Sequence, residues 1–363
     1  MTCARRMPPL LSLIASDTRY WILDSGDNCV NLHCCMSMRN YFDNLPEDIA
    51  GISDRIDQLM GETLESDSPS LRHAVELFRR HPGKRLRPML MGIVASAFGE
   101  ISDRVVQGGT FIEMIHVATL IHDDVIDDSD MRRGTKALHV LFGNRKAVLM
   151  GDYVLSKAIL LAVDLEEPLV LQILSHVGES LTEGELMQDD ASQLAETSEA
   201  WYYDIIRRKT ASLLAASATL GAILTGMKDE ETTLEIHEAT LRLGMAFQIR
   251  DDLFDYLPTP ELGKPAGNDL REHKVTLPLI YALEHSGRRG DRARRLLRQS
   301  ELSDEDIRAL THFAIESGGI DYAEQEMHRL LSEAKEHYAR VIPEGRSLDL
   351  LYQLCDYIAE REK

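Results

Sequence analysis

From about residue 40 onward, apolar residues recur every three to four positions, the spacing of helices that bury one face. Ile49, Ile52, Ile56 and Met60 begin this pattern, and strand-like alternation is hard to find. Gly and Pro residues divide the pattern into segments. The expected breaks lie at Pro82-Gly83, Gly99, Gly108-Gly109, Gly134, Gly143, Glu167-Pro168, Gly226, 258–265, 287–290, Gly318-Gly319 and 343–345. The pattern predicts an all-α protein of about ten or more helices joined by short loops.

The first 37 residues differ from the rest of the chain. Arg5 and Arg6 precede an apolar run, 7–15, that looks like the start of a signal peptide, but the run is short and two prolines interrupt it. Three aspartates between residues 17 and 27 argue against a transit peptide. We therefore expect residues 1–37 to be a poorly ordered extension and residues 38–363 to form the folded domain, with Met36 or Met38 as a natural first residue.

Charge and cysteine content narrow the choice of partners and compartment. The chain has 60 acidic and 40 basic residues, a net charge of −20, which argues against nucleic acid and against tight binding to anionic membranes. No run of eighteen apolar residues occurs, so we expect no transmembrane helix and at most peripheral membrane contact. Four of the five cysteines lie within the first 35 residues, and none has the spacing of a metal site or disulfide framework. A reducing compartment, the cytoplasm, is therefore expected.

Two matching acidic clusters lie within apolar helical stretches. The first is Asp123-Asp124-x-x-Asp127, and the second is Asp251-Asp252-x-x-Asp255. The first and last Asp of each cluster share one helix face, where like charges repel unless a cation lies between them. One such cluster is unremarkable in a chain with 60 acidic residues. Two of them predict a two-sided site for a divalent cation such as Mg²⁺, which prefers oxygen ligands and bridges carboxylates to substrate phosphates.

Basic residues near these clusters indicate a phosphate ligand. They are Lys84 and Arg87 at a helix start, Arg132 and Arg133 after the first cluster, Lys209 after another helical stretch, and Lys264 and Lys274 after the second cluster. Each one alone fits a solvated turn or a helix end. Together with the acidic clusters, they predict a site that holds a polyanion through metal ions and cationic side chains.

The motifs, taken in order, resemble those of the trans-isoprenyl diphosphate synthases. They are Gly-Lys-Arg-Leu-Arg-Pro at 83–88, His116, the stretch from Leu120 to Gly134, Lys209-Thr210, and the stretch from Phe247 to Asp255. The resemblance covers about residues 45–360, and the sequence at 123–134 is most similar to the long-chain, octaprenyl type. It implies a single-domain bundle around a central cavity, prenyl diphosphate substrates and a homodimer.

The resemblance also implies a role for each motif residue. Asp123 and Asp127 would hold two Mg²⁺ ions, and Asp251, helped by Asp255, a third; Asp124 and Asp252 complete the clusters. Arg132, Lys209 and Lys264 would contact the allylic diphosphate, whereas Lys84, Arg87, His116 and Arg133 would hold isopentenyl diphosphate. The backbone near Lys209, the Thr210 hydroxyl and the Gln248 amide would face the allylic cation.

Product length depends on the helix that carries the first cluster. In short-chain members of the family, an aromatic residue four or five positions before the first Asp blocks the product tunnel. Here these positions hold Thr119 and Ala118, both small, so the path stays open for another turn, about 5.4 Å. Ile115, Met114 and Phe111 are the next candidates for its floor. We expect about eight isoprene units, unless a side chain from 150–165 closes the tunnel sooner.

The sequence thus predicts Mg²⁺-dependent elongation of an allylic prenyl diphosphate by successive additions of isopentenyl diphosphate. A geranylgeranyl or farnesyl diphosphate synthase is the nearest alternative. A class I terpene cyclase usually mixes Asn, Ser and Glu in its second metal motif and has more aromatic residues. A non-catalytic synthase subunit tends to lose one acidic cluster, and an acidic helical scaffold would bind divalent ions only weakly.

Overall fold

The computed structural model describes residue 41 and residues 45–81, 83, 85–132, 134–194, 197–256 and 267–361. Nearly all of this part of the chain is helical, in more than ten helices, so the predicted all-α fold is confirmed. No helix within it is both long enough and apolar enough to cross a membrane. The predicted extension 1–37 and the boundary at residue 38 lie outside the described residues.

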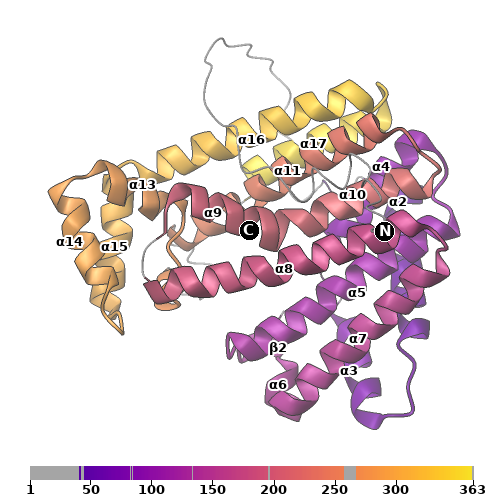
Figure 1. Ribbon diagram of the computed structural model, residues 1–363, viewed down its shortest axis with the longest axis horizontal. Coiled ribbons are helices and arrows are strands. Elements are labelled where there is room, and N and C mark those ends of the chain that lie inside the picture. Colours follow the sequence, from indigo (N-terminus) through magenta and orange to yellow (C-terminus); the bar gives the residue numbers. More distant parts are fainter. Residues whose placement is uncertain are drawn as a thin grey trace, which may run out of the picture.

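The elements follow one another without a large sheet (Figure 1). They are α2 (Glu47–Thr63), α3 (Pro69–Arg80), α4 (Leu86–Phe98), α5 (Asp103–Ile126), β1 (Met131–Arg132), β2 (Thr135–Lys136), α6 (Leu138–Phe142), α7 (Asn144–Asp164), α8 (Pro168–Leu194), α9 (Glu199–Ile206), the π-helix η2 (Arg207–Ala211), α10 (Ser212–Leu224), α11 (Glu230–Tyr256), α12 (Asn268–Arg271), α13 (Leu277–His285), α14 (Arg288–Leu297), α15 (Asp304–Glu316), α16 (Gly319–Val341) and α17 (Arg346–Glu360).

Helix α10 lies at the centre of the bundle. Its residues from Leu213 to Leu224 are all buried, as expected for a helix that is apolar on every side. It packs against α4, α5, α8 and α11. Gly221 allows the closest approach, because a Cβ there would lie 2.5 Å from the carbonyl oxygen of Met91 on α4. The long helices that carry the acidic clusters, α5 and α11, are therefore both held against one apolar helix.

The predicted break at Gly108-Gly109 is wrong, because α5 runs through it without interruption. Both glycines are buried and serve close packing. A Cβ at Gly108 would lie 2.3 Å from Leu224 Cδ1, and one at Gly109 would lie 2.6 Å from Ile56 Cδ1. Two glycines lower the helical propensity of α5, but they allow closer contact with α10 and α2.

A short β-ribbon, which the sequence pattern did not predict, follows the first acidic cluster. Helix α5 ends at Ile126, and Met131 and Arg132 of β1 pair antiparallel with residues 135–136 of β2. Gly134 lies in the tight turn with a φ of +78°, a conformation that suits glycine. Arg132 thus lies on a ribbon beyond the helix, not at the helix end as predicted.

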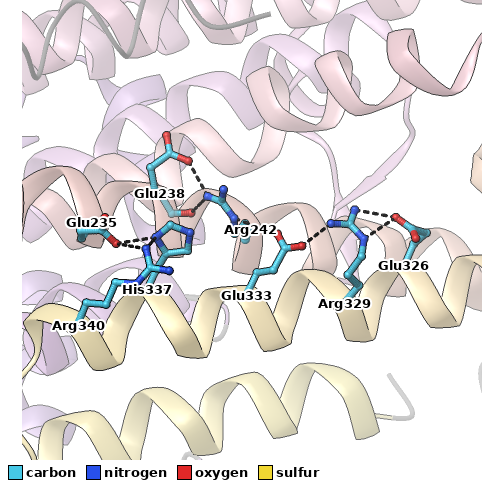
Figure 2. A network of polar contacts seen from close by, with 8 residues as sticks. All are labelled: Glu235, Glu238, Arg242, Glu326, Arg329, Glu333, His337 and Arg340. Atoms are coloured by element: carbon cyan, nitrogen blue, oxygen red, sulfur yellow. Dashed lines mark hydrogen bonds and ion pairs between the residues drawn. The ribbon is translucent and has the colours of Figure 1, made fainter. Parts of the chain in front are cut away.

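Helices α11 and α16 are joined by a row of ion pairs, the α11–α16 ladder (Figure 2). Its members are Glu235, Glu238, Arg242, Glu326, Arg329, Glu333, His337 and Arg340. Acidic and basic side chains from the two helices meet along this row. Glu235 of α11 lies 2.6 Å from His337 of α16, and Arg242 of α11 lies 3.2 Å from Glu333 of α16. The ladder fixes the register of α16 on α11, whose opposite end carries the second acidic cluster.

Candidate active site

The two acidic clusters lie at the C-terminal ends of α5 and α11. Asp123 is half-buried on the last turn of α5, and Asp127 is the exposed residue that terminates this helix. Asp251, Asp252 and Asp255 lie on the last two turns of α11. A helix C-terminus carries partial negative charge, so both clusters add carboxylates where the helix itself disfavours them.

Several charged side chains lie near Asp123. Burial raises its pKa to about 6; Lys209 lowers it, Glu185 and Asp127 raise it further, and Arg132 lowers it. Lys209 forms an ion pair with Glu185 of α8 at 2.5 Å. The predicted residues Asp123, Lys209 and Arg132 are thus brought together, and Glu185 joins them although the sequence did not single it out.

The π-helix η2 places Lys209 and Thr210 in this space. Such wider turns are rare and occur often at functional sites. Two glycines bring the neighbouring helices close to it. A Cβ at Gly184 of α8 would lie 3.0 Å from the Lys209 nitrogen, and one at Gly244 of α11 would lie 2.6 Å from Ala211 Cα. Lys209 and Thr210 therefore contact α8 and α11 directly.

A chain of hydrogen bonds links η2 to the second cluster and to α9. The Thr210 hydroxyl donates to Gln248 Oε1 at 2.7 Å, and Gln248 Nε2 donates to Asp252 Oδ1 at 2.8 Å. The buried Tyr202 hydroxyl donates to the other oxygen, Asp252 Oδ2, at 2.6 Å. Burial raises the pKa of Asp252, these two hydrogen bonds lower it, and Asp251 and Asp255 raise it. Both oxygens of Asp252 are thus engaged by uncharged donors.

Asp255 binds the backbone at the start of α12. Its Oδ1 and Oδ2 accept the backbone N–H groups of Asn268 and Asp269, each at 3.0 Å. Asp269 is half-buried, and desolvation together with Asp252 and Asp255 raises its pKa. The second cluster therefore contains a fourth carboxylate, Asp269, which lies beyond the predicted motif.

Lys274 connects the two clusters. Burial lowers its pKa, but its 2.6 Å hydrogen bond to Glu272 and the nearby charges of Asp127 and Asp269 raise it above its ordinary value. The pKa of Lys274 is thus influenced by Asp127, the last Asp of the first cluster, and by Asp269 beside the second. Lys274 therefore lies near carboxylates of both clusters.

Arg361, just beyond the end of α17, lies against the second cluster. Its guanidinium forms an ion pair with Asp251 and lies 3.9 Å from the ring centroid of Phe247. Its carbonyl oxygen accepts two hydrogen bonds from Arg250. The C-terminal end of the described chain is therefore part of the site, a contact that motif spacing alone does not predict because the two residues are 110 positions apart.

The first cluster divides its residues between two surfaces. Asp124 is buried and binds the guanidinium of Arg132, with Nε donating to Oδ1 at 2.6 Å. Both residues also line a small cavity of about 60 Å³. Leu77, Phe78, His81, Val117, Leu120, Ile121, Thr135, Lys136, Ala137 and Leu138 complete its lining. Asp124 therefore orients Arg132, while Asp123 faces Lys209.

The residues predicted to hold isopentenyl diphosphate are only partly described. Arg87 lies in the first turn of α4 and His116 on α5, both half-buried; Lys84, Arg133 and the allylic candidate Lys264 lie outside the described residues. Arg85, between Lys84 and Arg87, has a left-handed backbone with a φ of +51° and pairs with Glu113 and Asp57. This buried pairing, which the sequence did not signal, ties the basic loop to α5.

The residues predicted to set product length lie where expected on α5. Ala118 is buried, and the half-buried Thr119 donates a hydrogen bond to the His116 carbonyl at 2.9 Å. Phe111, Met114 and Ile115 are buried one to two turns earlier. Buried residues of α7, including Val154 and Ala158, belong to the same hydrophobic cluster as Ala118. The candidate floor residues of α5 and these residues of α7 thus belong to one hydrophobic cluster.

The donor set suits a hard divalent cation. Its carboxylates have raised pKa values or lie beside other carboxylates, so added positive charge would stabilise their ionised forms. Within the described ranges, no three His, Cys, Asp or Glu side chains are close enough to hold an ion by themselves. Such a site suits Mg²⁺, which keeps several waters and takes further ligands from a substrate phosphate.

Known proteins were compared with the chain. Residues 68–313 match the family model for polyprenyl synthetase. The octaprenyl diphosphate synthase of Haemophilus influenzae is 33% identical over 314 residues, which cover 85% of this chain and 93% of that protein. A decaprenyl diphosphate synthase from Rhodobacter capsulatus superposes with a TM-score of 0.83 at 31% identity, covering 89% of this chain and 99% of the other.

A polyprenyl synthase from Caulobacter crescentus, solved with calcium and isoprenyl diphosphate, gives a TM-score of 0.81 at 33% identity, covering 90% and 98% of the two chains. Geranylgeranyl pyrophosphate synthases are also among the matches. The chain belongs to the polyprenyl synthetase family, the trans-isoprenyl diphosphate synthases, is of their long-chain type, and is a prenyltransferase.

Proposed function

We propose that this protein catalyses Mg²⁺-dependent condensation of an allylic prenyl diphosphate with isopentenyl diphosphate, in successive steps that give an all-trans polyprenyl diphosphate of about eight isoprene units. The observation that carries the proposal is that Asp123 lies beside Lys209 and Arg132 and that Lys274 is close to both Asp127 and Asp269, from which we infer a common space between the clusters. Carboxylates and cations mixed in this way suit a diphosphate bound with metal ions.

Each side of this space has a proposed task. Asp123 and Asp127 on one side, and Asp251 with Asp255 on the other, would hold about three Mg²⁺ ions. When bound, Mg²⁺ supplies positive charge that neutralises the leaving diphosphate. Arg132 and Lys209 reach the same anion, and Asp124 keeps the Arg132 guanidinium oriented.

The chemistry requires charge stabilisation and little else from the protein. The carbon–oxygen bond of the allylic diphosphate breaks, the diphosphate takes the electron pair, and the isopentenyl double bond attacks the resulting cation. The departing diphosphate accepts the proton that is then lost, so no protein base is needed. Oxygen atoms near the cation, those of Thr210 and Gln248, stabilise its charge.

A radiolabelled assay tests this function. Purified protein is incubated with farnesyl diphosphate, labelled isopentenyl diphosphate and Mg²⁺, and the products are separated by chain length. Elongation is expected. Cyclised hydrocarbon products indicate a terpene cyclase, and activity that appears only with a second polypeptide indicates a synthase subunit. Absence of all three contradicts the proposal.

Product length is tested at Ala118. Ala118→Tyr places a large ring on the buried face of α5, one turn before Asp123, and we expect products shorter by several isoprene units. Thr119→Ser, which keeps its position small, serves as the matched control and leaves the product distribution unchanged. An unchanged product from a folded Ala118→Tyr protein contradicts the tunnel assignment.

A shorter product, such as geranylgeranyl diphosphate, is the second candidate. The observation in its favour is that Val154 and Ala158 of α7 pack in the same hydrophobic cluster as Ala118 and could close the tunnel. Replacing Val154 with Ala distinguishes the two. Lengthening of the product by this variant places the floor on α7, whereas no change places it on α5.

We further propose that a second copy of the chain covers the outer faces of α7 and α8. Large apolar side chains are exposed there: Leu149, Ile159, Leu160, Val163 and Leu186 have between 42% and 61% of their surface accessible. Such a patch is typical of an interface. Light scattering is expected to give a homodimer, and Leu160→Asp is expected to weaken it. A cytoplasmic location, with at most peripheral membrane contact, is part of the same proposal.

A further inference from the structure

Tyr202 is a buried tyrosine whose hydroxyl points at the second acidic cluster. Only 4% of its surface is accessible, and its hydroxyl lies 2.6 Å from Asp252 Oδ2. Asp252, also buried, receives its second hydrogen bond from Gln248 at 2.8 Å, and Gln248 in turn accepts one from Thr210 at 2.7 Å. Four side chains from α9, α11 and η2 thus form one continuous hydrogen-bonded chain.

The chemistry of this chain fixes its direction. Gln248 turns its NH₂ group to Asp252 Oδ1, which accepts the hydrogen bond, and its carbonyl oxygen to the Thr210 hydroxyl. The Thr210 hydroxyl then donates its proton to that carbonyl, which leaves the lone pairs of the hydroxyl oxygen directed elsewhere. A reversed amide would oppose two acceptors at Asp252 and turn its partly positive NH₂ group toward Thr210 and the neighbouring Lys209.

The direction matters because a cation is stabilised by oxygen lone pairs and destabilised by N–H groups. We propose that Tyr202 is a positioning residue for prenyl transfer, which holds Asp252 so that the Gln248 amide and the Thr210 hydroxyl present oxygen, and not N–H, to the allylic cation. This inference rests on the proposed function, since it gives these oxygens a cation to face. Tyr202 itself touches no substrate.

The chain offers a matched control at the next position. The Tyr203 hydroxyl also donates to a carboxylate, Glu326 on α16, at 3.0 Å. Glu326 belongs to the α11–α16 ladder and is a member of neither acidic cluster (Figure 2). Tyr202→Phe and Tyr203→Phe therefore remove the same group from adjacent residues of one helix, but only the first removal reaches Gln248.

The experiment compares kcat and KM for both diphosphate substrates in the full-length protein. For Tyr202→Phe we expect kcat to fall about 10- to 100-fold, the usual effect of losing a partner that orients an active-site ligand, with both KM values unchanged. Tyr203→Phe retains the activity of the unmodified protein. Thermal unfolding midpoints of both variants show that the assay temperature lies below each transition.

A double-mutant cycle separates positioning from general damage to the fold. Because Tyr202 acts through Gln248, adding Tyr202→Phe to Gln248→Ala is expected to cost little further activity. Gln248→Glu, which keeps the size of the side chain but cannot donate to Asp252, gives the same loss of kcat without altering the packing of Tyr202.

The outcomes are distinct from those that test the proposed function. No elongation by the unmodified protein contradicts the function and the inference together. Elongation by the unmodified protein with an unchanged kcat for Tyr202→Phe overturns the inference alone. Losses that add fully in the double mutant also overturn it, because they assign Tyr202 a structural role independent of Gln248.

Discussion

Helix α11 carries two acidic stretches that differ in how their charge is met. In the α11–α16 ladder, Glu235 and Glu238 each have an arginine within 3.3 Å, Arg340 and Arg242 respectively (Figure 2). Thirteen residues beyond Glu238, the second cluster begins. These two glutamates therefore already have basic partners within the protein.

The second cluster is met mainly by uncharged donors in the part of the chain that is described. Asp252 receives Tyr202 and Gln248, and Asp255 receives two backbone N–H groups. Of the three aspartates, Asp251 is the one with a cationic partner among the described residues, Arg361. Acidic residues of α11 that form ion pairs with arginines thus contribute to stability. Those that only accept hydrogen bonds remain suited to binding a cation.

Helix α9 links these two regions. Its adjacent tyrosines point to different carboxylates, Tyr202 to Asp252 of the cluster and Tyr203 to Glu326 of the ladder. The acidic cluster and the ladder can therefore be altered separately by the same kind of substitution, so that a variant in one region serves as the control for a variant in the other.

The largest effect is expected from removing a cluster carboxylate. Asp123→Asn should lower kcat/KM about 100- to 1,000-fold, the loss typical of one preorganised electrostatic group. Glu238→Gln in the ladder removes the same charge at similar exposure and should leave steady-state kinetics unchanged. Equal losses from the two variants would mean that the regions do not differ in function.

Metal removal should distinguish the regions through stability. Ions bound only by the folded protein stabilise it by about 2.7 kcal/mol at a free concentration 100 times Kd. We expect Mg²⁺ to raise the unfolding midpoint of the unmodified protein and of Glu238→Gln, and to have a much smaller effect on Asp251→Asn. Calorimetry in EDTA and in Mg²⁺ measures this. A shift retained by Asp251→Asn places the ion elsewhere.

Stability of the metal-free protein should depend on pH in a direction that Asp123 sets. Its pKa rises from the ordinary value of 3.8 to about 6 in the fold, so the folded state binds the proton more tightly than the unfolded chain. The contribution is fully present below pH 3.8 and is lost as the pH rises through 6.

Asp123→Asn removes this contribution, so the difference in unfolding free energy between variant and unmodified protein should move in favour of the variant as the pH rises from 4 to 7. Denaturant titrations in EDTA measure the difference. Comparing the two proteins cancels the contribution of His237, which both contain. Burial lowers the pKa of His237 to about 4, so His237 destabilises the fold as the pH falls. A difference independent of pH contradicts the raised pKa.

The sequence predicted the helical fold because local spacing determines it, whereas the roles assigned to the site residues remain predictions from their motifs. Periodic apolar residues gave the helices, and the Asp-Asp-x-x-Asp repeats gave their ends on α5 and α11. Gly108 and Gly109 were misread because close packing between helices leaves the same glycine signal as a break. The ribbon at Arg132 has only two residues per strand, too few for a pattern.

Residues missed in the site act through contacts distant in sequence. Tyr202 meets Asp252 across 50 positions, and Arg361 meets Asp251 across 110. Asp269 had a local signal, since it follows Gly267 and Asn268 at a helix start, but its link to Asp255 is a contact between residues 14 positions apart. Spacing identifies which residues share a helix face, whereas the partner that orients each one depends on tertiary packing.

The smallest effect is expected within the ladder itself. Arg329 pairs with Glu326 at 2.7 Å and with Glu333 at 2.5 Å, but 38% of its side chain is exposed, so water and salt weaken both pairs. Arg329→Gln should cost less than about 1 kcal/mol of unfolding free energy. Because screening already weakens the pairs, the cost should shrink further in 1 M salt, while Mg²⁺ affinity and kcat stay constant. A change in Mg²⁺ affinity would show that the ladder and the acidic cluster, despite their different partners, are coupled along α11.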